Sequence, residues 1–197
     1  MPNLTQQLLE AVAESQDLLV KLPLLAGELD RFGRALLSCW ERRGKVLVAG
    51  NGGSAADAMH FAEELVVRFR KNRRALAAIA LCDPTVISCA GNDFGYESVF
   101  ERQIEALGNP GDVFVAFTTS GNSVNLLRAL DLAKAQGVTT VTFLGKGGGL
   151  AAGRADLELI VPSDNTARIQ EAHKLLFHTL CDWIDDQVDE VPLRAAA

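Results

Sequence analysis

Apolar residues recur along the chain with two periods that alternate. Short, nearly continuous apolar runs occur at residues 46–49, 76–81, 112–117, 138–144 and 157–161. Runs of this length are typical of buried strands in a parallel sheet. Apolar positions at three- and four-residue spacing predict helices from residue 55 onward and at 97–107, 124–135 and 166–188, with a shorter helix or turn at 84–92. The alternation predicts an α/β fold: a five-stranded parallel sheet flanked by helices, with right-handed crossovers.

Two further helices precede the first strand. Residues 3–23 and 27–43 both carry an apolar face, and Pro23 and Gly44 end them. A small sheet does not need both helices as cover. Either they contact other copies in a homo-oligomer, or they form a two-helix layer on the chain's own sheet. We divide the chain into an N-terminal helical segment, residues 1–44, and one compact α/β domain, residues 45–197.

The turn after the first strand combines an anion site with a reactive pair. Gly50, Gly52 and Gly53 break the apolar run, Ser54 is a candidate N-cap, and Asp57 stands at the capping-box position. The free N–H groups and positive dipole end of a helix N-terminus favour an anion. The turn has neither the Walker ending nor the G-x-G-x-x-G pattern.

On the helix that follows, His60 and Glu64 are four residues apart and share one face. That spacing suits a metal-ligand pair or an acid/base pair, although such pairs are more often plain surface pairs. The glycine turn and the pair together favour a functional site.

A second loop is rich in hydroxyl groups. Thr118, Thr119, Ser120 and Ser123 surround Gly121 between a strand and a helix. They predict a second anion cradle, or else an ordinary capping turn. Both loops leave carboxyl ends of strands, where ligands of such sheets bind, so they converge on one phosphate if their strands are neighbours. The final helix adds Gln170, His173 and His178 near these loops.

The net charge bears on the kind of ligand that the protein binds, and the cysteine content bears on its cellular compartment. The net charge of −6 argues against a nucleic-acid partner, which needs a basic face, but not against phosphate held by amides and hydroxyls. The four cysteines show no C-x-x-C spacing, which favours reduced thiols in a cytoplasmic protein. We see no signal-peptide pattern at the N-terminus and no apolar stretch of membrane-spanning length.

Taken together, the motifs resemble the phosphoheptose isomerases, which are sugar isomerase (SIS) domain proteins. The resemblance covers residues 3–187 and is carried by Gly-Asn-Gly-Gly-Ser-Ala-Ala-Asp-Ala-Met-His at 50–60, Gly-Asn-Asp at 91–93, Thr-Ser-Gly-Asn-Ser at 119–123, and Arg-Ile-Gln-Glu at 168–171 with His178. It implies a flavodoxin-like sheet and a homotetramer with active sites shared between subunits. It also implies interconversion of D-sedoheptulose 7-phosphate and D-glycero-D-manno-heptose 7-phosphate, an early step towards the heptose of lipopolysaccharide and other surface glycans.

The resemblance further implies the residues of the site. One zinc ion per subunit would be held by His60, Glu64, Gln170 and His178, and Glu64 and His178 would be the acid/base pair. The substrate contacts would be Asn51, Gly52, Gly53, Ser54, Asn92, Asp93, Thr118, Thr119, Ser120, Ser123 and Gln170.

The chemistry requires a proton to move between C1 and C2 of the sugar through an enediol. We expect Glu64 to be the base and His178 to serve the oxygens or to help open the ring, with zinc either a Lewis acid or a structural or inhibitory ion. Gln170 and His178 lie eight residues, about 12 Å, apart along one helix. Either both bend inward, or different subunits supply them, or Gln170 mainly holds the sugar.

An alternative function comes from a non-catalytic branch of the same family. The ending Cys-Asp-Trp-Ile-Asp at 181–185 resembles that branch, whose members bind the bacterial replication initiator. The chain would then be a tetrameric adaptor with a protein partner. The presence of His60, Glu64, Gln170 and His178 favours the enzyme.

Overall fold

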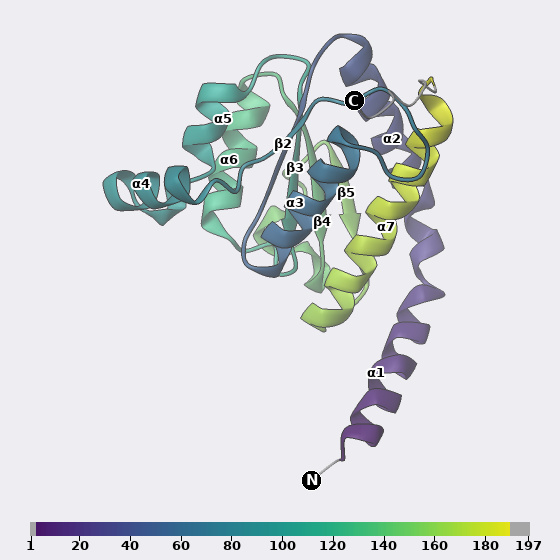
Figure 1. Cartoon of the computed structure of the whole chain (residues 1–197). Helices are drawn as coiled ribbons and strands as arrows, with labels where there is room; N and C mark the ends of the chain where they lie inside the picture. The colour runs from purple at the N-terminus through teal and green to yellow at the C-terminus, as the bar shows by residue number, and fades with distance from the viewer. Residues whose placement is uncertain (1–2, 190–197) are drawn as a thin grey trace, which may run out of the picture.

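The computed structural model describes residues 3–189 and contains the predicted five-stranded sheet (Figure 1). The strand order is β2-β1-β3-β4-β5, and all four neighbouring pairs are parallel. The strands are β1 Val46–Gly50, β2 Ala78–Ala80, β3 Val113–Thr118, β4 Thr139–Leu144 and β5 Leu157–Ile160. The α/β class, the five strands and their parallel direction are therefore confirmed.

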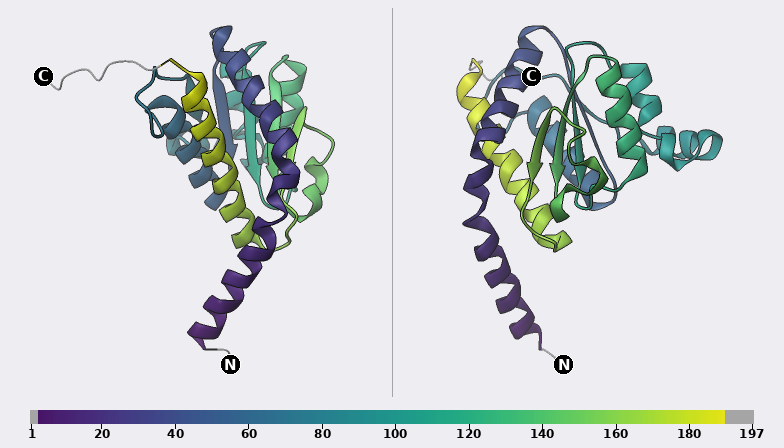
Figure 2. Two further views of the ribbon diagram at one scale, coloured as in Figure 1. Left: turned by 90° about the vertical axis from the view of Figure 1, so that its right-hand side faces the viewer. Right: turned by 180° about the vertical axis from the view of Figure 1, so that it is seen from behind.

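The helices are α1 Leu4–Leu19, α2 Ala26–Glu41, α3 Gly53–Val66, α4 Pro84–Phe94, α5 Glu101–Leu107, α6 Val124–Ala135 and α7 Thr166–Gln187. Three 3-10 turns join them: η1 Leu22–Leu25, η2 Tyr96–Ser98 and η3 Lys146–Ala151. Helices α2, α3 and α7 cover one face of the sheet and α5 and α6 the other, while α4 projects sideways (Figures 1 and 2). Within residues 3–189, no helix combines the length and apolarity that a membrane crossing requires.

Two hydrophobic cores lie on the two faces of the sheet. Val46, Val48, Val113 and Val115 pack with α2, α3 and α7, whereas the residues between them in β1 and β3 pack with α5 and α6. This alternation follows from the two-residue period of a strand. The sheet is thus buried on both sides, as its continuous apolar runs predict.

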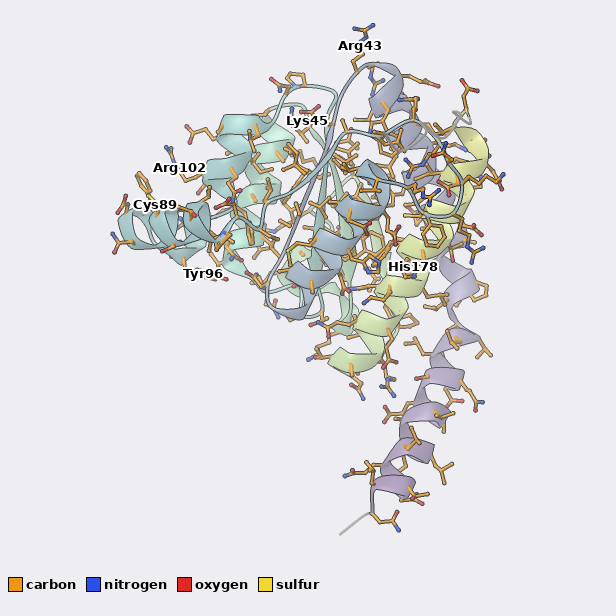
Figure 3. The ribbon with its side chains drawn as sticks, viewed as in Figure 1. Arg43, Lys45, Cys89, Tyr96, Arg102 and His178 are labelled. Carbon is orange, nitrogen blue, oxygen red and sulfur yellow. The ribbon has the colours of Figure 1, made fainter. Side chains whose placement is uncertain are left out.

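Several predicted boundaries shift for local reasons. β3 begins at Val113 because the Asp112 carboxylate accepts the backbone N–H groups of Lys45 and Asn109, both at 2.9 Å, and pairs with the Lys45 ammonium at 2.6 Å. Figure 3 labels Lys45 just before β1. The predicted helix 97–107 is a 3-10 turn followed by α5. The predicted loop at 145–149 overlaps η3, but Gly147, Gly148 and Gly149 have non-helical backbone angles there.

The start of α3 corrects the predicted cap. The N-cap position is Gly52, whose φ of 57° is one that side chains rarely adopt, and it provides no side-chain hydrogen bond. Ser54 is a buried residue of the first turn instead. Asp57 is therefore not part of a capping box, and it faces α7.

The two N-terminal helices have different environments. Phe32, Leu36 and Trp40 of α2 are buried in the chain's own core, together with α3 and α7. The idea that α2 serves mainly other subunits is therefore wrong, while α1 extends away from the body (Figures 1 and 2). Leu8 of α1 is 62% exposed, and Leu18 alone of that helix is buried. The division at residue 44 stays a prediction.

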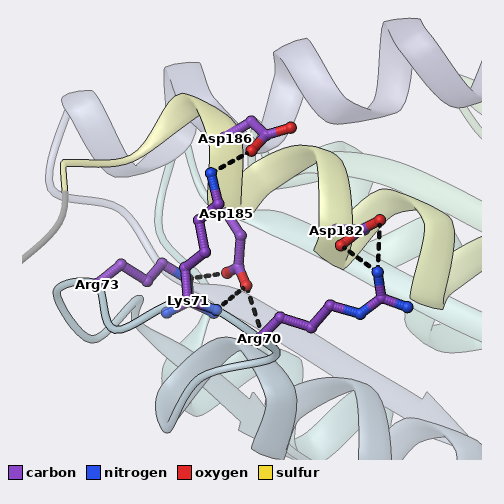
Figure 4. A network of polar contacts seen from close by, with 6 residues as sticks. All are labelled: Arg70, Lys71, Arg73, Asp182, Asp185 and Asp186. Carbon is purple, nitrogen blue, oxygen red and sulfur yellow. Dashed lines mark hydrogen bonds and ion pairs between the residues drawn. The ribbon is translucent and has the colours of Figure 1, made fainter.

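A buried ion pair ties the end of α3 to α7 (Figure 4). The Arg73 guanidinium donates to Asp185 Oδ1 at 2.8 Å and to the carbonyl oxygens of Glu64 at 2.7 Å and Leu65 at 3.0 Å. Asp185 Oδ2 accepts the backbone N–H groups of Arg70 at 2.7 Å and Lys71 at 2.8 Å. Burial opposes ionisation of Asp185, but these donors outweigh it and hold its pKa below the ordinary value. Arg73 thus caps the last carbonyls of α3 and fixes the loop after it.

We predict that Asp185→Asn destabilises the protein by roughly 3–5 kcal/mol, because it leaves the Arg73 charge buried without its partner. Denaturant unfolding at one fixed protein concentration would measure this loss in the free energy of unfolding. Asp186→Asn is the matched control, since its ion pair with Lys71 lies at the surface and is worth less than about 1 kcal/mol. Equal stability of the two variants would contradict the prediction.

Candidate functional site

Helices α3 and α7 bring three of the predicted site residues together. His60 Nε2 lies 3.0 Å from Glu64 Oε1, and the rings of His60 and His178 meet edge to face with centroids 5.0 Å apart. One ligand atom from each of the three residues lies within 4.8 Å of the others. In Figure 3, His178 lies where α7 passes α3. We call His60, Glu64 and His178 the triad.

The surroundings of His178 keep its imidazole neutral and in place. Its ring stacks on Phe69 at 5.4 Å and meets the edge of Phe177 at 4.6 Å. Burial, together with the nearby His60, lowers the pKa of His178. Its Nε2 atom is buried and has no hydrogen-bond partner among the described residues.

Two imidazoles and a carboxylate are ligands that zinc accepts, and a catalytic zinc site has three protein ligands of these kinds. The orphaned Nε2 atom is what a missing metal would leave behind. The triad therefore fits a metal ion.

Gln170 is placed apart from the triad in the same chain. Its side-chain amide packs against Gly53, where a Cβ atom would overlap the amide nitrogen. Because α3 and α7 run in the same direction, contacts follow in order: Gly53 with Gln170, Asp57 with Lys174, and His60 with His178. Gln170 thus lies about two turns from the triad and next to the glycine turn.

The glycine turn and the hydroxyl loop meet, as predicted for neighbouring strands. β1 pairs with β3, and Asn51 and Asn125 exchange two side-chain hydrogen bonds, of 3.0 and 2.9 Å. The Tyr96 hydroxyl donates to Asn51 Oδ1 at 3.0 Å. A pocket of about 450 Å³ is lined by these three residues and by Ser123, with Glu97 and Val124. This is the size of a small-ligand site at a strand end.

The hydroxyl loop is partly a turn and partly open. Thr118 Oγ1 accepts the Gly121 N–H, and Ser120 Oγ accepts the Asn122 N–H, both at 3.2 Å. Ser123 is the N-cap of α6, but its side chain makes no capping bond. Ser123 lines the pocket instead, so the capping alternative accounts for Thr118 and Ser120 but not for Ser123.

Asn92 and Asp93 lie elsewhere in this chain. Both are on the projecting helix α4, where Asn92 Nδ2 donates to Asp93 Oδ1 at 2.7 Å. They line an open pocket with Ser88 and Cys89, on an element far from α3 and α7 in Figures 1 and 2. One chain therefore does not bring them to the triad.

One histidine of α7 lies in the core, and two residues of the pocket are not marked by the sequence. His173 is fully buried between Phe117 and Phe143, its Nε2 lies 3.1 Å from the Leu144 carbonyl, and burial lowers its pKa to about 4. It is a neutral core residue. Asn125 and Tyr96 line the pocket, but neither belongs to a hydrophobic pattern or a motif that would have pointed to a site. A polar residue just after the hydroxyl loop was the available signal for Asn125.

The chain is similar to known proteins over most of its length. The SIS domain family matches residues 10–145. Phosphoheptose isomerase 1 of Campylobacter jejuni is 49% identical over 174 residues, which cover 88% of this chain and 94% of that protein. The phosphoheptose isomerase of Paramagnetospirillum magneticum is 56% identical over 143 residues, 72% of this chain and 74% of that protein.

Solved structures of phosphoheptose isomerases have the same fold as this chain. The phosphoheptose isomerase of Neisseria gonorrhoeae superposes with a TM-score of 0.88 at 39% identity, covering 93% of this chain and 100% of that one. The enzyme of Francisella tularensis gives a TM-score of 0.91 at 37% identity, covering 94% and 100%. This chain belongs to the phosphoheptose isomerase family of SIS-domain proteins.

Proposed function

We propose that this protein interconverts D-sedoheptulose 7-phosphate and D-glycero-D-manno-heptose 7-phosphate. The observation that carries the proposal is the triad of His60, Glu64 and His178, held within 4.8 Å in a chain of the phosphoheptose isomerase family. A pocket between two strand-end loops nearby supplies the place for a phosphosugar. An adaptor would need neither the triad nor the pocket.

We propose zinc, one ion per subunit, as the metal that the triad holds. Bound there, zinc would act as a Lewis acid that polarises an oxygen of the sugar. Gln170 of the same chain is about 12 Å along α7 from His178, so it would join a metal only across a subunit boundary. Within its own chain we assign Gln170 to the sugar, because its amide lies at the glycine turn.

Glu64 is the base in this proposal. Its carboxylate is largely buried, and His60 lies within hydrogen-bonding distance and restricts its orientation. A positioned carboxylate can take the proton from one sugar carbon and return it to the next. His178, neutral because burial lowers its pKa, can exchange a proton with the sugar oxygens.

The two strand-end loops hold the other end of the substrate. Asn51, Gly52, Gly53 and Ser54 on one side, and Thr118, Thr119, Ser120 and Ser123 on the other, would bind the phosphate and nearby hydroxyls. Phosphate bound at the N-termini of α3 and α6 gains from their dipoles. That binding energy positions C1 and C2 at the reacting groups.

We further propose a cytoplasmic protein whose product enters heptose synthesis for lipopolysaccharide and related glycans. The family supports the pathway, and the four unpaired cysteines suit a reducing compartment.

We predict a homotetramer, in which the exposed apolar residues of α1 are covered by other subunits. Leu4, Leu8, Leu9 and Val12 present an apolar surface with no cover in one chain. A shared site would also bring Asn92 and Asp93 of one subunit towards the triad of another. Light scattering would measure the mass in solution. A monodisperse monomer would contradict both the tetramer and the shared site.

We predict that Glu64→Gln and His178→Asn each reduce zinc binding and lower the isomerisation rate by roughly 10²–10⁴-fold, because each removes an acid/base group that is also a metal ligand. Turnover of sedoheptulose 7-phosphate, metal content and melting temperature would be measured on the same samples. Glu63→Gln, an exposed neighbour on α3, is the matched control and should behave as wild type. Wild-type protein that is metal-free as purified, and inactive with or without added zinc, would rule out the isomerase.

We predict that Ser120→Ala and Ser123→Ala raise the KM for sedoheptulose 7-phosphate roughly 10- to 150-fold, since each removes a hydrogen bond to a charged group worth about 1.5–3 kcal/mol. Ser163→Ala is the control, because Ser163 Oγ accepts the Asn165 N–H at 3.2 Å in the same kind of turn but outside the pocket. Steady-state kinetics would decide. Unchanged KM in both loop variants would make the hydroxyl loop a structural cap only.

A further inference from the structure

Asp57 is a buried carboxylate with an incomplete set of partners. It lies on α3 three residues before His60, and the whole residue is 4% exposed. Its Oδ1 atom is 3.5 Å from the Lys174 ammonium on α7. Its Oδ2 atom is buried and has no hydrogen-bond partner within residues 3–189. Neither a cap nor the triad accounts for this side chain.

A buried carboxylate is costly unless hydrogen bonds and an opposite charge compensate for lost water. Charge-assisted N–H···O bonds are about 2.7–2.9 Å long, so the contact with Lys174 is a loose one. Burial raises the pKa of Asp57 in spite of Lys174, in keeping with the unpaired Oδ2 atom. A buried polar atom left unpaired in this way needs an explanation, and an absent ligand is one.

Asp57 lines a pocket that continues from the glycine turn. The pocket has a volume of about 300 Å³ and lies between α3 and the first turns of α7, with Gly53, Asp57, Gln170, Glu171 and Lys174 among its lining residues. Its lining shares no residue with the pocket of Asn51 and Ser123. Along α3, Asp57 stands about 6 Å past Gly53 and about 4.5 Å before His60. It is therefore midway between the phosphate-binding turn and the triad.

We propose that Asp57 and Lys174 form a hydroxyl-binding subsite, and that it holds the hydroxylated carbon chain of the sugar between its phosphate end and its reacting end. This inference rests on the proposed function, because it takes the sugar phosphate as the ligand.

The chemistry of the subsite selects hydroxyl groups over ions. A hydroxyl both donates and accepts, so it can donate to Asp57 and accept from Lys174. A phosphate group would be repelled by the buried Asp57 carboxylate, and a cation by Lys174. The Lys174 side chain is 48% exposed, so it can change rotamer as a ligand enters. A sugar hydroxyl then supplies the partner that Oδ2 lacks.

The test compares two ligands on Asp57→Asn, which keeps the shape and removes the charged acceptor. Calorimetry would give dissociation constants for the equilibrated sedoheptulose 7-phosphate mixture and for inorganic phosphate, beside kcat and KM. We expect the sugar phosphate to bind roughly 10- to 150-fold more weakly, because a hydrogen bond to a charged group is lost. Inorganic phosphate, which occupies only the phosphate end, should bind as to wild type. KM should rise with little change in kcat, and metal content should stay constant.

Asp186→Asn is the matched control, since it removes another Asp–Lys pair of α7 that lies at the surface. It should change neither dissociation constant. Lys174→Met tests the same subsite from α7 and should weaken the binding of sugar phosphate but not that of inorganic phosphate. The melting temperature also separates the explanations, because replacing a poorly compensated buried charge should not lower it.

Four results would overturn the subsite: unchanged binding of the sugar phosphate, equal weakening of inorganic phosphate, loss of metal from Asp57→Asn, or a large loss of stability. Unchanged binding would mean that Asp57 does not contact the sugar, and equal weakening of inorganic phosphate would mean that it acts at the phosphate end. Loss of metal would mean that it supports the triad, and a large loss of stability would make it a structural residue. Wild-type protein that binds the sugar phosphate but does not isomerise it would contradict the proposed function alone. In that case the two dissociation constants still decide the subsite.

Discussion

The register between α3 and α7 is the constraint on which the site depends. His60 and Glu64 come from one helix and His178 from the other, so their distances are set by how the two helices lie alongside each other. The buried Arg73–Asp185 pair fixes that register at one end. Since Arg73 also donates to the Glu64 carbonyl, the ion pair acts directly on the backbone of a triad residue. At the other end, the missing side chain of Gly53 admits the Gln170 amide.

The strand order supplies the second constraint. β1 and β3 are neighbours in the sheet, so the glycine turn and the hydroxyl loop leave adjacent carboxyl ends. Asn51 and Asn125 then connect the two loops through paired amides. The Leu126 N–H donates to Asn125 Oδ1 at 2.9 Å, which fixes the orientation of that amide. Asn51 must then present its oxygen to Asn125 Nδ2, and the Tyr96 hydroxyl must donate. The orientation of a pocket residue therefore follows from one backbone N–H group.

What the sequence predicts well is whatever depends on local pattern. Continuous apolar runs locate the strands, and the four-residue spacing places His60 and Glu64 on one face of a helix. What it predicts poorly depends on contacts between distant segments. Ser54 is a residue type that commonly caps a helix, but the N-cap position of α3 is Gly52. Arg73 acts through its contact with Asp185, which is 112 residues away in the sequence. Patterns of local spacing cannot predict a contact at that separation. For the same reason the sequence leaves open whether Gln170 reaches the metal or the sugar, and the register that packs its amide on Gly53 favours the sugar within one chain.

Two buried polar atoms lack hydrogen-bond partners along the contact between α3 and α7, and the way in which this contact is fixed explains them. Its two ends are closed by strong or close contacts, the Arg73–Asp185 pair and the packing of Gln170 on Gly53. Between them, His178 Nε2 and Asp57 Oδ2 are buried without hydrogen-bond partners in the part of the chain that the structure describes. The fixed ends prevent the helices from shifting to satisfy these atoms internally. A site of this kind is preorganised, because the fold carries the cost of the unsatisfied groups before any ligand arrives.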